Sequence, residues 1–398
     1  MSALEGMRIL DMTQYEAGPS CTQLLAWLGA DVVKIEPRGQ GDAGRHLLTP
    51  DSNYSNYFCN WNSNKRSVAL DLTKPEGREL LFRMLPSYDV FVENYAPGVA
   101  EKLGVTYEAM TEVHPDLIYA SNKGFGNFGP RAQHKAYDQV VQAAAGAVSI
   151  TGEADGPPVM PGPTSADSGS GLHLAVGILA AYTQRARTGR GQRVDVSMQE
   201  AMLYLMRTMF SFRCDWGRQV VPRFGNIRGA PPTGMYPCKP GGANDFVYLM
   251  TITDKHWDSL CATIERLDLI ADERFSTSLD RFKNADAIFA EITKWTKERT
   301  KQEIQEILGS AGVPCSGVAD SVDIHQDSHL QARGFLHELD LPEHGRQTLM
   351  GSGVRLSESE IELTRAPLLG EHTDEVLAQD LGISSQELRA LREGGVVG

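Results

Sequence analysis

Asp167 stands among small residues directly ahead of an apolar stretch, a position in which a carboxylate could do covalent chemistry. Residues 162–171 read Gly-Pro-Thr-Ser-Ala-Asp-Ser-Gly-Ser-Gly, which leaves room for a large substrate to approach the side chain. A helix expected over residues 170–187 would direct its N-terminal N–H groups and partial positive charge at this carboxylate. An aspartate kept ionised and accessible in this way can act as a nucleophile. The alternative, which the local sequence alone favours, is that Asp167 only N-caps the helix.

Other patterns with possible chemistry lack the context that they need. Residues 124–129 match G-x-G-x-x-G after an expected strand, but Pro130 follows in place of a helix and no acidic residue lies at the ribose-binding distance. That leaves open a glycine-rich loop whose backbone approaches some other ligand. His325 and His329 stand four apart, but no third ligand accompanies them, so a solvated helix face is the favoured interpretation. We therefore expect no nicotinamide, flavin or metal site.

A compact basic cluster, residues 64–67 (Asn-Lys-Arg-Ser) with Lys74 nearby, stands out in an acidic chain. It could be an ordinary solvated turn or an edge that binds phosphate groups. The 398 residues carry 51 Asp plus Glu against 38 Lys plus Arg, a net charge of -13. This balance argues against a general nucleic-acid binder, because counterion release needs a basic face.

The composition, 41% hydrophobic and 22% charged, is typical of a globular protein. The first six residues lack the features of a signal peptide, and the most apolar stretch, residues 171–182, is too short to span a bilayer. We expect a cytoplasmic protein with no membrane partner. Six scattered cysteines without zinc spacing should be reduced and structural: Cys21, Cys59, Cys214, Cys238, Cys261 and Cys315.

The elements that must position Asp167 alternate between strands and helices in the N-terminal half. Expected strands cover residues 7–12, 31–36, 89–93 and 117–121, and expected helices cover residues 18–27 and 74–84. Alternation of this kind predicts parallel βαβ units and a doubly wound α/β sheet. The helix at 170–187 is apolar on nearly every face and should therefore be buried. A further helix is expected over residues 200–212.

The character of the chain changes after residue 213. Residues 221–240 are rich in glycine and proline and should cross between domains. A strand at 246–250 and helices between 256 and 311 predict a smaller α+β domain. Short strands are expected within 350–363, and a polar helix from residue 384. We predict a first part of the large domain over 1–212, linker and small domain over 213–325, and a return segment over 326–398 that completes the large domain.

Taken in order, these segments resemble the class III CoA-transferases, and most closely the formyl-CoA transferase branch. The match runs nearly end to end. Its pieces are residues 17–19 (Ala-Gly-Pro), 28–36 (Leu-Gly-Ala-Asp-Val-Val-Lys-Ile-Glu), 64–67, 92–95 with 97–98, 123–126, 137–138, 188–192, 312–314 and 366–373.

The resemblance implies that Asp167 is the catalytic carboxylate, which attacks an acyl-CoA thioester and passes through an acyl-aspartyl anhydride and an aspartyl-CoA thioester. It implies CoA as a substrate, with no tightly bound cofactor. It also implies a homodimer of interlocked, ring-shaped chains, with crossing segments near 190–225 and 320–350. CoA would be bound by residues 94–102 and by basic or apolar neighbours, and the thioester would lie near two further residues. These implied contacts are Arg66, Leu72, Lys74, Asn94, Tyr95, Lys102 and Lys123 for CoA, and Tyr137 and Asp138 for the thioester.

Two positions depart from the formyl-CoA transferase branch and concern the substrate pocket. The branch has a glutamine after the first strand, where this chain has Glu16. It also has a mobile Gly-Gly-Gly-Gly-Gln loop, where this chain reads Arg-Gly-Ala-Pro-Pro-Thr-Gly from 228 to 234 and retains Gly229 and Gly234. Two prolines make that loop stiffer, and a second carboxylate at Glu16 disfavours a small dianion. The acid substrate therefore stays open.

Two other functions compete with CoA transfer. An α-methylacyl-CoA racemase would need the Gly-His-Asp segment of that branch, whereas this chain has Ala136-Tyr137-Asp138. A phenol that titrates near pH 10 is a poor base at neutral pH, so transfer is favoured. A non-catalytic CoA-binding protein would need Asp167 to be only a helix cap.

Overall fold

The computed structural model describes residues 2–49, 52–212, 215, 217–226, 230–360 and 362–398. Its contacts divide the chain into two compact units. The larger unit comprises Met1–Val148, Met160–Val221 and Gly334–Gly398, and the smaller comprises Ser149–Val159 and Pro222–Arg333.

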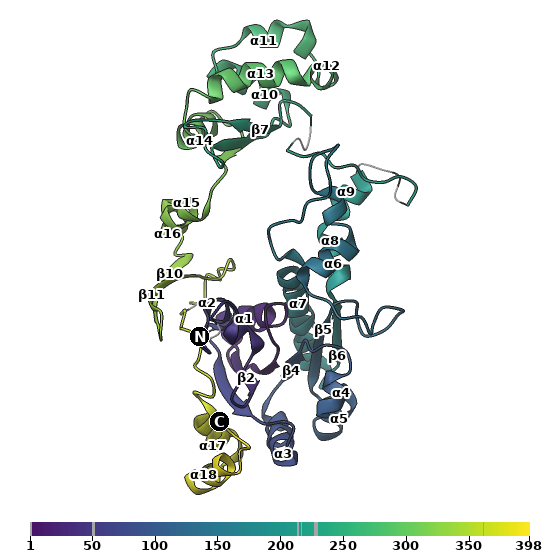
Figure 1. Ribbon diagram of the computed structural model, residues 1–398, viewed down its shortest axis with the longest axis vertical. Helices are drawn as coiled ribbons and strands as arrows, with labels where there is room; N and C mark the ends of the chain where they lie inside the picture. The colour runs from purple at the N-terminus through teal and green to yellow at the C-terminus, as the bar shows by residue number, and fades with distance from the viewer. Residues whose placement is uncertain (1, 50–51, 213–214, 216, 227–229, 361) are drawn as a thin grey trace. The chain divides into compact units, whose positions relative to one another are not determined.

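A six-stranded sheet forms the centre of the larger unit (Figure 1). Its strands are β1 (Arg8–Met12), β2 (Asp31–Pro37), β3 (Arg66–Leu70), β4 (Val90–Glu93), β5 (Ile118–Lys123) and β6 (Arg193–Ser197). The order is β3-β2-β1-β4-β5-β6, and every neighbouring pair is parallel. This is the strand order of the Rossmann fold, in which the order reverses between β1 and β4. The predicted doubly wound α/β class is confirmed.

The sequence prediction missed the two edge strands, β3 and β6. β3 begins inside the basic cluster at residues 64–67, where Lys65 and Ser67 are buried. That cluster is therefore not the solvated turn that one interpretation proposed. β6 reads Arg-Val-Asp-Val-Ser and is half exposed, so its short alternation of charge and valine did not stand out.

Alternate residues of the strands face opposite layers of helices, as the two-residue period of a strand requires. Ile9 and Val32 belong to a core with α1 (Pro19–Trp27) and α7 (Ser165–Thr188). Leu10 and Val33 belong to a second core with α3 (Pro75–Met84), α5 (Tyr107–Val113) and the C-terminal helices α17 (Thr373–Leu381) and α18 (Ser385–Glu393). The remaining helices of this unit are α2 (Asn56–Asn62), α4 (Val99–Leu103), α6 (Asp138–Ala145), α8 (Met198–Leu205) and α9 (Arg207–Phe212), with short 3₁₀ turns at Ala43–His46, Leu85–Ser87 and Val148–Ile150.

Helix α7 begins at Ser165, five residues before its predicted start, so Asp167 lies inside the helix rather than in a loop ahead of it. Its C-terminal end at Gly189 agrees with the prediction. The prediction that the helix is buried on nearly every face is wrong, because the side chains of Leu172 and Val176 are 56% and 68% exposed. One side of the helix packs on the sheet, and apolar residues on the other side face outward in the single chain.

The C-terminal part of the larger unit contains a hairpin and two helices. The hairpin pairs β10 (Leu336–Leu341) with β11 (Gly345–Met350) in antiparallel register. The prediction of short strands within 350–363 is wrong, because the strand pair ends where that range begins. Helices α17 and α18 (yellow in Figure 1) complete one face of the sheet, and α17 contacts β3 and α3.

The smaller unit is a three-stranded antiparallel sheet packed with helices. Its strands are β7 (Gly234–Pro237), β8 (Phe246–Leu249) and β9 (Cys315–Gly317). Its helices are α10 (Asp254–Thr263), α11 (Asp268–Ala271), α12 (Ser278–Lys283), α13 (Ala285–Thr296), α14 (Lys301–Ser310), α15 (Ser321–Gln326) and α16 (Ser328–Ala332), with a 3₁₀ turn at Glu273–Phe275. Tyr236, Trp257 and Phe275 are buried in its core. His325 and His329 lie on separate short helices, both exposed.

Within the described ranges, three further observations bear on function. No helix is long and apolar enough to cross a membrane. No group of three or more His, Cys, Asp or Glu side chains could hold a metal ion. The five described cysteines are free thiols, as expected; Cys214 lies outside the described residues.

Candidate active site

A cavity of about 180 Å³ opens at the carboxyl ends of β1, β4 and β5. Its lining comes from the loops that follow these strands, from the segment before α6 and from the first turn of α7: Gln14, Tyr15, Ala17, Asn94, Tyr95, Ala96, Pro97, Asn122, Lys123, Gly124, His134, Lys135, Ala136, Tyr137, Asp167 and Met198. Because the strand order reverses between β1 and β4, this is the crevice in which open α/β sheets bind their ligands.

Asp167 lines this cavity, and its carboxylate accepts no hydrogen bond within the described chain. Thr164, not Asp167, is the N-cap residue of α7. The backbone N–H groups of Ala166 and Asp167 donate to Asp138 Oδ1 at 2.9 and 3.2 Å. The capping alternative for Asp167 is therefore wrong, because Asp138 already takes the donors that a cap would satisfy.

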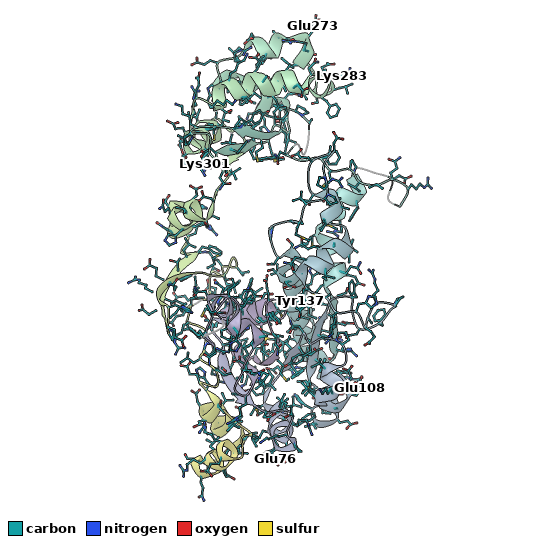
Figure 2. The ribbon with its side chains drawn as sticks, viewed as in Figure 1. Glu76, Glu108, Tyr137, Glu273, Lys283 and Lys301 are labelled. Carbon is teal, nitrogen blue, oxygen red and sulfur yellow. The ribbon has the colours of Figure 1, made fainter. Side chains whose placement is uncertain are left out.

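Asp138 is held from both sides. Its other oxygen, Oδ2, accepts from Gln142 Nε2 at 2.5 Å, one turn along α6. Asp138 is the first residue of α6 and is 3% exposed. This carboxylate thus joins the start of α6 to the start of α7. Tyr137 precedes it and is 63% exposed at the cavity (labelled in Figure 2).

Glu16 is buried against the same helical turn. Its Oε1 accepts hydrogen bonds from Thr164 Oγ1 and, at 2.7 Å, from Ser168 Oγ. The close approach of α1 and α7 makes this contact possible: a Cβ at Gly171 would lie only 2.9 Å from Ala17 O. Asp167 is therefore flanked along the helix by the two hydroxyls that hold Glu16.

Three carboxylates, Glu16, Asp138 and Asp167, meet at the start of α7, and within the described residues none of them forms an ion pair. Burial, with added repulsion from Glu16 and Asp138, raises the pKa of Asp167 to about 8. Burial also raises the pKa of Glu16, against the lowering effect of its hydroxyl donors. The sequence predicted that the helix end keeps Asp167 ionised. Burial and the like charges of Glu16 and Asp138 act in the opposite direction and raise its pKa.

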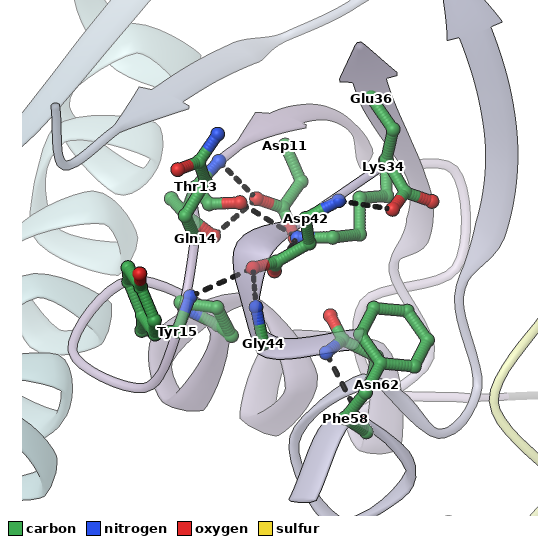
Figure 3. A network of polar contacts seen from close by, with 12 residues as sticks. Asp11, Thr13, Gln14, Tyr15, Lys34, Glu36, Asp42, Gly44, Phe58 and Asn62 are labelled. Atoms are coloured by element: carbon green, nitrogen blue, oxygen red, sulfur yellow. Dashed lines mark hydrogen bonds and ion pairs between the residues drawn. The ribbon is translucent and has the colours of Figure 1, made fainter. Parts of the chain in front are cut away.

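The loop of residues 13–17, which carries Glu16, is fixed by four side chains. Figure 3 shows Asp11, Lys34 and Asp42, and Asn94 is the fourth. Asp11 Oδ1 accepts from Thr13 N at 2.8 Å, and Lys34 Nζ donates to Thr13 O at 2.6 Å. The Asn94 amide accepts from Gln14 N at 2.8 Å and donates to Gln14 O at 2.9 Å. Asp42 Oδ1 accepts from Tyr15 N at 3.0 Å. Successive backbone groups of the loop are thereby satisfied, so the loop is preorganised.

Buried ion pairs lie beneath this loop. Lys34 Nζ lies 2.9 Å from Asp42 Oδ2, and Lys65 Nζ lies 2.9 Å from Asp11 Oδ2. Arg45 donates to both oxygens of Glu36 at 2.7 Å. Burial alone would raise the pKa of Asp11, but Lys34 and Lys65 hold it well below its usual range.

Known proteins resemble this chain over nearly its whole length. A family model described as CoA-transferase family III matches residues 4–373. The chain belongs to this family. It is 41% identical to the formyl-CoA:oxalate CoA-transferase of Streptomyces coelicolor, covering 99% of each chain, and 39% identical to that of Rhodopseudomonas palustris, covering 99% of this chain and 97% of the relative.

Solved structures of family proteins have the same fold. A CAIB/BAIF family protein from Brucella suis superposes with a TM-score of 0.84 at 30% identity, over 95% of this chain and 99% of that one. A hypothetical protein from Mycobacterium tuberculosis gives a TM-score of 0.80 at 28% identity, over 95% and 99% of the two chains. The family assignment thus comes from the sequence, and the fold is that of these solved structures.

The family resemblance implied seven CoA-binding residues, and the structure brings only some of them to the cavity. Asn94, Tyr95 and Lys123 line it. Lys123 Nζ is ion-paired with Glu93 at 2.6 Å and donates to Tyr95 O at 2.7 Å, so its charge is already compensated. The Asn94 amide makes one donated and one accepted hydrogen bond to the backbone of Gln14.

The other implied CoA contacts lie away from the cavity lining. Arg66 pairs with Asp31 at 2.6 Å and with Glu375 at 3.1 Å. Leu72 is 8% exposed in the core beneath α3. Lys74 Nζ donates to Gly394 O. Lys102, in the last turn of α4, is exposed. The roles of all four in CoA binding stay predictions.

Of the two pocket glycines, Gly229 lies outside the described residues. Gly234 begins β7 in the smaller unit and is buried, and a Cβ there would lie 2.7 Å from the Phe289 ring. This close packing explains why the position holds a glycine. Its role in the substrate pocket stays a prediction.

Sequence reasoning missed several residues that the structure places at the site. Tyr15, His134 and Lys135 line the cavity, and Lys34 and Asp42 hold the loop beneath it. The lining residues occur in irregular segments without a motif. The signal for Lys34 was available, since a lysine amid Val-Val-Lys-Ile-Glu of a parallel strand must be buried and therefore paired.

Proposed function

We propose that the protein transfers CoA from an acyl-CoA to a free carboxylic acid, with Asp167 as the covalent nucleophile. The observation that carries this proposal is the Asp167 carboxylate, which lines the cavity at the switch point of the sheet without a hydrogen-bond partner among the described residues. The N–H groups at the start of α7 that a capping side chain would bind donate to Asp138 instead. The Asp167 carboxylate therefore stays available to a ligand. The CoA-transferase relatives are consistent with this chemistry.

The proposed reaction conserves the thioester energy in two exchanges. The Asp167 carboxylate attacks the thioester carbonyl and the C–S bond breaks. This step releases CoA as the thiolate and forms an acyl-aspartyl anhydride. The thiolate then attacks the aspartyl carbonyl, which releases the donor acid and leaves an aspartyl-CoA thioester. The acceptor carboxylate attacks the aspartyl-CoA thioester, displaces the thiolate and forms a second anhydride. The thiolate then attacks the carbonyl that the acceptor acid contributed to this anhydride. New acyl-CoA forms and Asp167 is regenerated.

The site contributes position and environment to these steps. A carboxylate is a weak nucleophile in water, and burial in a fixed geometry raises its effective reactivity. Glu16 accepts from hydroxyl groups of the helical turn that carries Asp167, and Asp138 accepts from backbone N–H groups of the same turn. Burial, together with repulsion from Glu16 and Asp138, raises the free energy of ionised Asp167, and acylation removes that cost by converting the charge into a neutral anhydride.

We also propose that the chain works as a homodimer. Leu172 and Val176 on α7 are 56% and 68% exposed, and Tyr204 and Leu205 on α8 are 51% and 52% exposed. Helices α7 and α8 pack against one another, so these side chains support an apolar face that a second copy would cover. Sedimentation equilibrium of the wild type and of Val176→Glu tests this proposal. We expect the wild type to be a dimer and Val176→Glu to dimerise more weakly. A monomeric wild type would contradict the proposed homodimer.

The covalent step is tested by trapping. The protein is incubated with formyl-, acetyl- or succinyl-CoA, treated with hydroxylamine or borohydride, digested and analysed by mass spectrometry. We expect the modification on the peptide that contains Asp167, and none on Asp167→Asn. An unmodified Asp167 together with full transfer activity in Asp167→Asn would refute the mechanism. Because the relatives are named for formyl-CoA and oxalate, that pair is the first donor and acceptor to assay.

A further inference from the structure

Tyr15 occupies an unusual place at the active site. It lies three residues beyond β1, lines the cavity together with Tyr137 and Asp167, and has a positive φ of 61°. Its ring and that of Tyr137 meet edge to face, with centroids 6.0 Å apart and planes at 88°. The two rings come from separate loops and form one aromatic wall of the cavity.

The backbone of Tyr15 is held in this uncommon conformation by its neighbours. Asp42 Oδ1 accepts from Tyr15 N at 3.0 Å, and Asn94 binds both backbone groups of Gln14. Left-handed backbone at a bulky residue persists only where surrounding contacts impose it, and such positions gather at ligand sites. Asp42 and Asn94 thus direct an aromatic ring to this point of the cavity by fixing the backbone that carries it.

We propose that Tyr15 is a specificity-determining residue, which with Tyr137 selects short acceptor acids with an apolar remainder over the small dianion oxalate. This inference rests on the proposed function, since it names the acid that Asp167 activates. The acceptor's reacting carboxylate must reach the Asp167 carbonyl, so its remainder lies in the surrounding cavity, whose lining includes both rings. Apolar carbon gains from contact with these rings, whereas a second carboxylate loses hydration there.

The charges around the cavity favour the same choice. Oxalate would bring a second negative charge within one bond of the reacting carboxylate, close to the cluster of Glu16, Asp138 and Asp167. Of the basic side chains that line the cavity, Lys123 is already paired with Glu93. Lys135 and His134 are exposed in the segment before α6. Pairing of Lys135 with an acceptor dianion would instead favour oxalate. A comparison of oxalate with an apolar acid as acceptors distinguishes the two preferences.

The test compares propionate and oxalate as acceptors in full-length wild type, Tyr15→Asn and Tyr15→Phe. Asparagine tolerates positive φ better than other non-glycine residues, so Tyr15→Asn removes the ring and keeps the backbone. Tyr15→Phe is the matched control that keeps the ring. The donor is whichever of formyl-, acetyl- and succinyl-CoA labels Asp167 fastest in the wild type.

We expect wild-type kcat/KM for propionate to exceed that for oxalate by about tenfold or more, the range that one or two buried carbons give. In Tyr15→Asn this ratio falls about tenfold, and in Tyr15→Phe it stays within about twofold. Tyr137→Ala, at a 63% exposed side chain, moves the ratio in the same direction and decides the matter if Tyr15→Asn does not fold. A wild type that prefers oxalate, or a ratio that neither ring-removing variant changes, would overturn the proposal.

The outcome is separable from that of the proposed function. Labelling of Asp167 by acyl-CoA does not depend on the acceptor. Wild type that is labelled but prefers oxalate refutes only the role of Tyr15, whereas wild type without label or transfer to any acid refutes the covalent mechanism itself.

Discussion

Two groups of buried carboxylates lie at the carboxyl ends of the same sheet, and they differ in whether a cation accompanies them. Asp11, Glu36 and Asp42 each pair with a buried lysine or arginine at 2.7–2.9 Å. Glu16 and Asp167, at the start of α7, have hydroxyl donors or no donor at all. The loop of residues 13–17 connects the two groups. Carboxylates of the first group bind its backbone, and its own Glu16 side chain is a member of the second group.

The difference shows in the pKa values. Burial raises the pKa of Glu36, but the hydrogen bonds and charge of Arg45 more than offset this and hold it below its usual range. Burial with no cation, together with like charges, raises the pKa of Asp167 to about 8. Compensated carboxylates thus build the scaffold, and the uncompensated carboxylate is the one for which we propose reactivity, since strongly perturbed pKa values gather at functional sites. Four predictions would break or sharpen this contrast.

The largest effect is expected from removing the uncompensated nucleophile. Asp167→Asn keeps the volume and the backbone N–H that donates to Asp138 but cannot form an anhydride. We expect transfer, measured by chromatography of the acyl-CoA products, to fall by about a thousandfold or more. Asp155→Asn, at an exposed aspartate of the smaller unit, is the matched control and should keep full activity. Equal losses in both variants would show that Asp167 has no special role.

Removing a cation from the compensated group should instead reduce stability. Arg45→Met leaves Glu36 buried without the guanidinium that binds both of its oxygens and removes a cation stacked 3.6 Å from the Phe58 ring. We expect the free energy of unfolding in urea to fall by about 3–5 kcal/mol. Arg190→Met, at an exposed arginine, should change it by less than about 0.5 kcal/mol. If Arg45→Met had the same free energy of unfolding as wild type, the ion pair of Arg45 and Glu36 would add nothing to stability beyond an apolar contact.

The contrast also explains how far the sequence could predict this site. The parallel sheet followed from apolar strands spaced by helices, and Asp167 followed from its small-residue run and the family resemblance. The environment of Asp167 did not follow, because Asp138 reaches it across a separation of 29 residues and Glu16 across about 150. Pairings such as Arg45 with Glu36 need the register of β2 and its turn. The role of Tyr15 depends on a backbone conformation that no local pattern indicates.

The pH dependence of the reaction reports the uncompensated cluster directly. Attack needs the Asp167 carboxylate, whose pKa burial and like charges raise to about 8. The rate of covalent labelling by acyl-CoA at low substrate should therefore rise about tenfold per pH unit below pH 8 and level off above it. Glu16→Gln removes one of the repelling charges, so its profile should shift to lower pH, whereas Glu76→Gln on the distant helix α3 (Figure 2) should leave it in place. A profile flat from pH 5 to 9 would exclude a raised pKa at the nucleophile.

The smallest effect concerns the stability cost of the uncompensated carboxylate. Folded Asp167 has a pKa of about 8, and in the unfolded chain an aspartate titrates near pH 4. Between these values the folded state holds a proton that the unfolded state has lost, so the contribution of Asp167 to wild-type stability falls as pH rises from about 4 to about 8. Asp167→Asn lacks this titration. We expect it to unfold at the same temperature as wild type at pH 4, and at pH 9 to be more stable by about 1–3 kcal/mol, the scale of a poorly compensated buried polar group. Thermal denaturation followed by circular dichroism measures both. A stability gain that is already complete at pH 4 would assign the effect to packing of the amide, and no gain at pH 9 would mean that the helix end compensates the Asp167 charge after all.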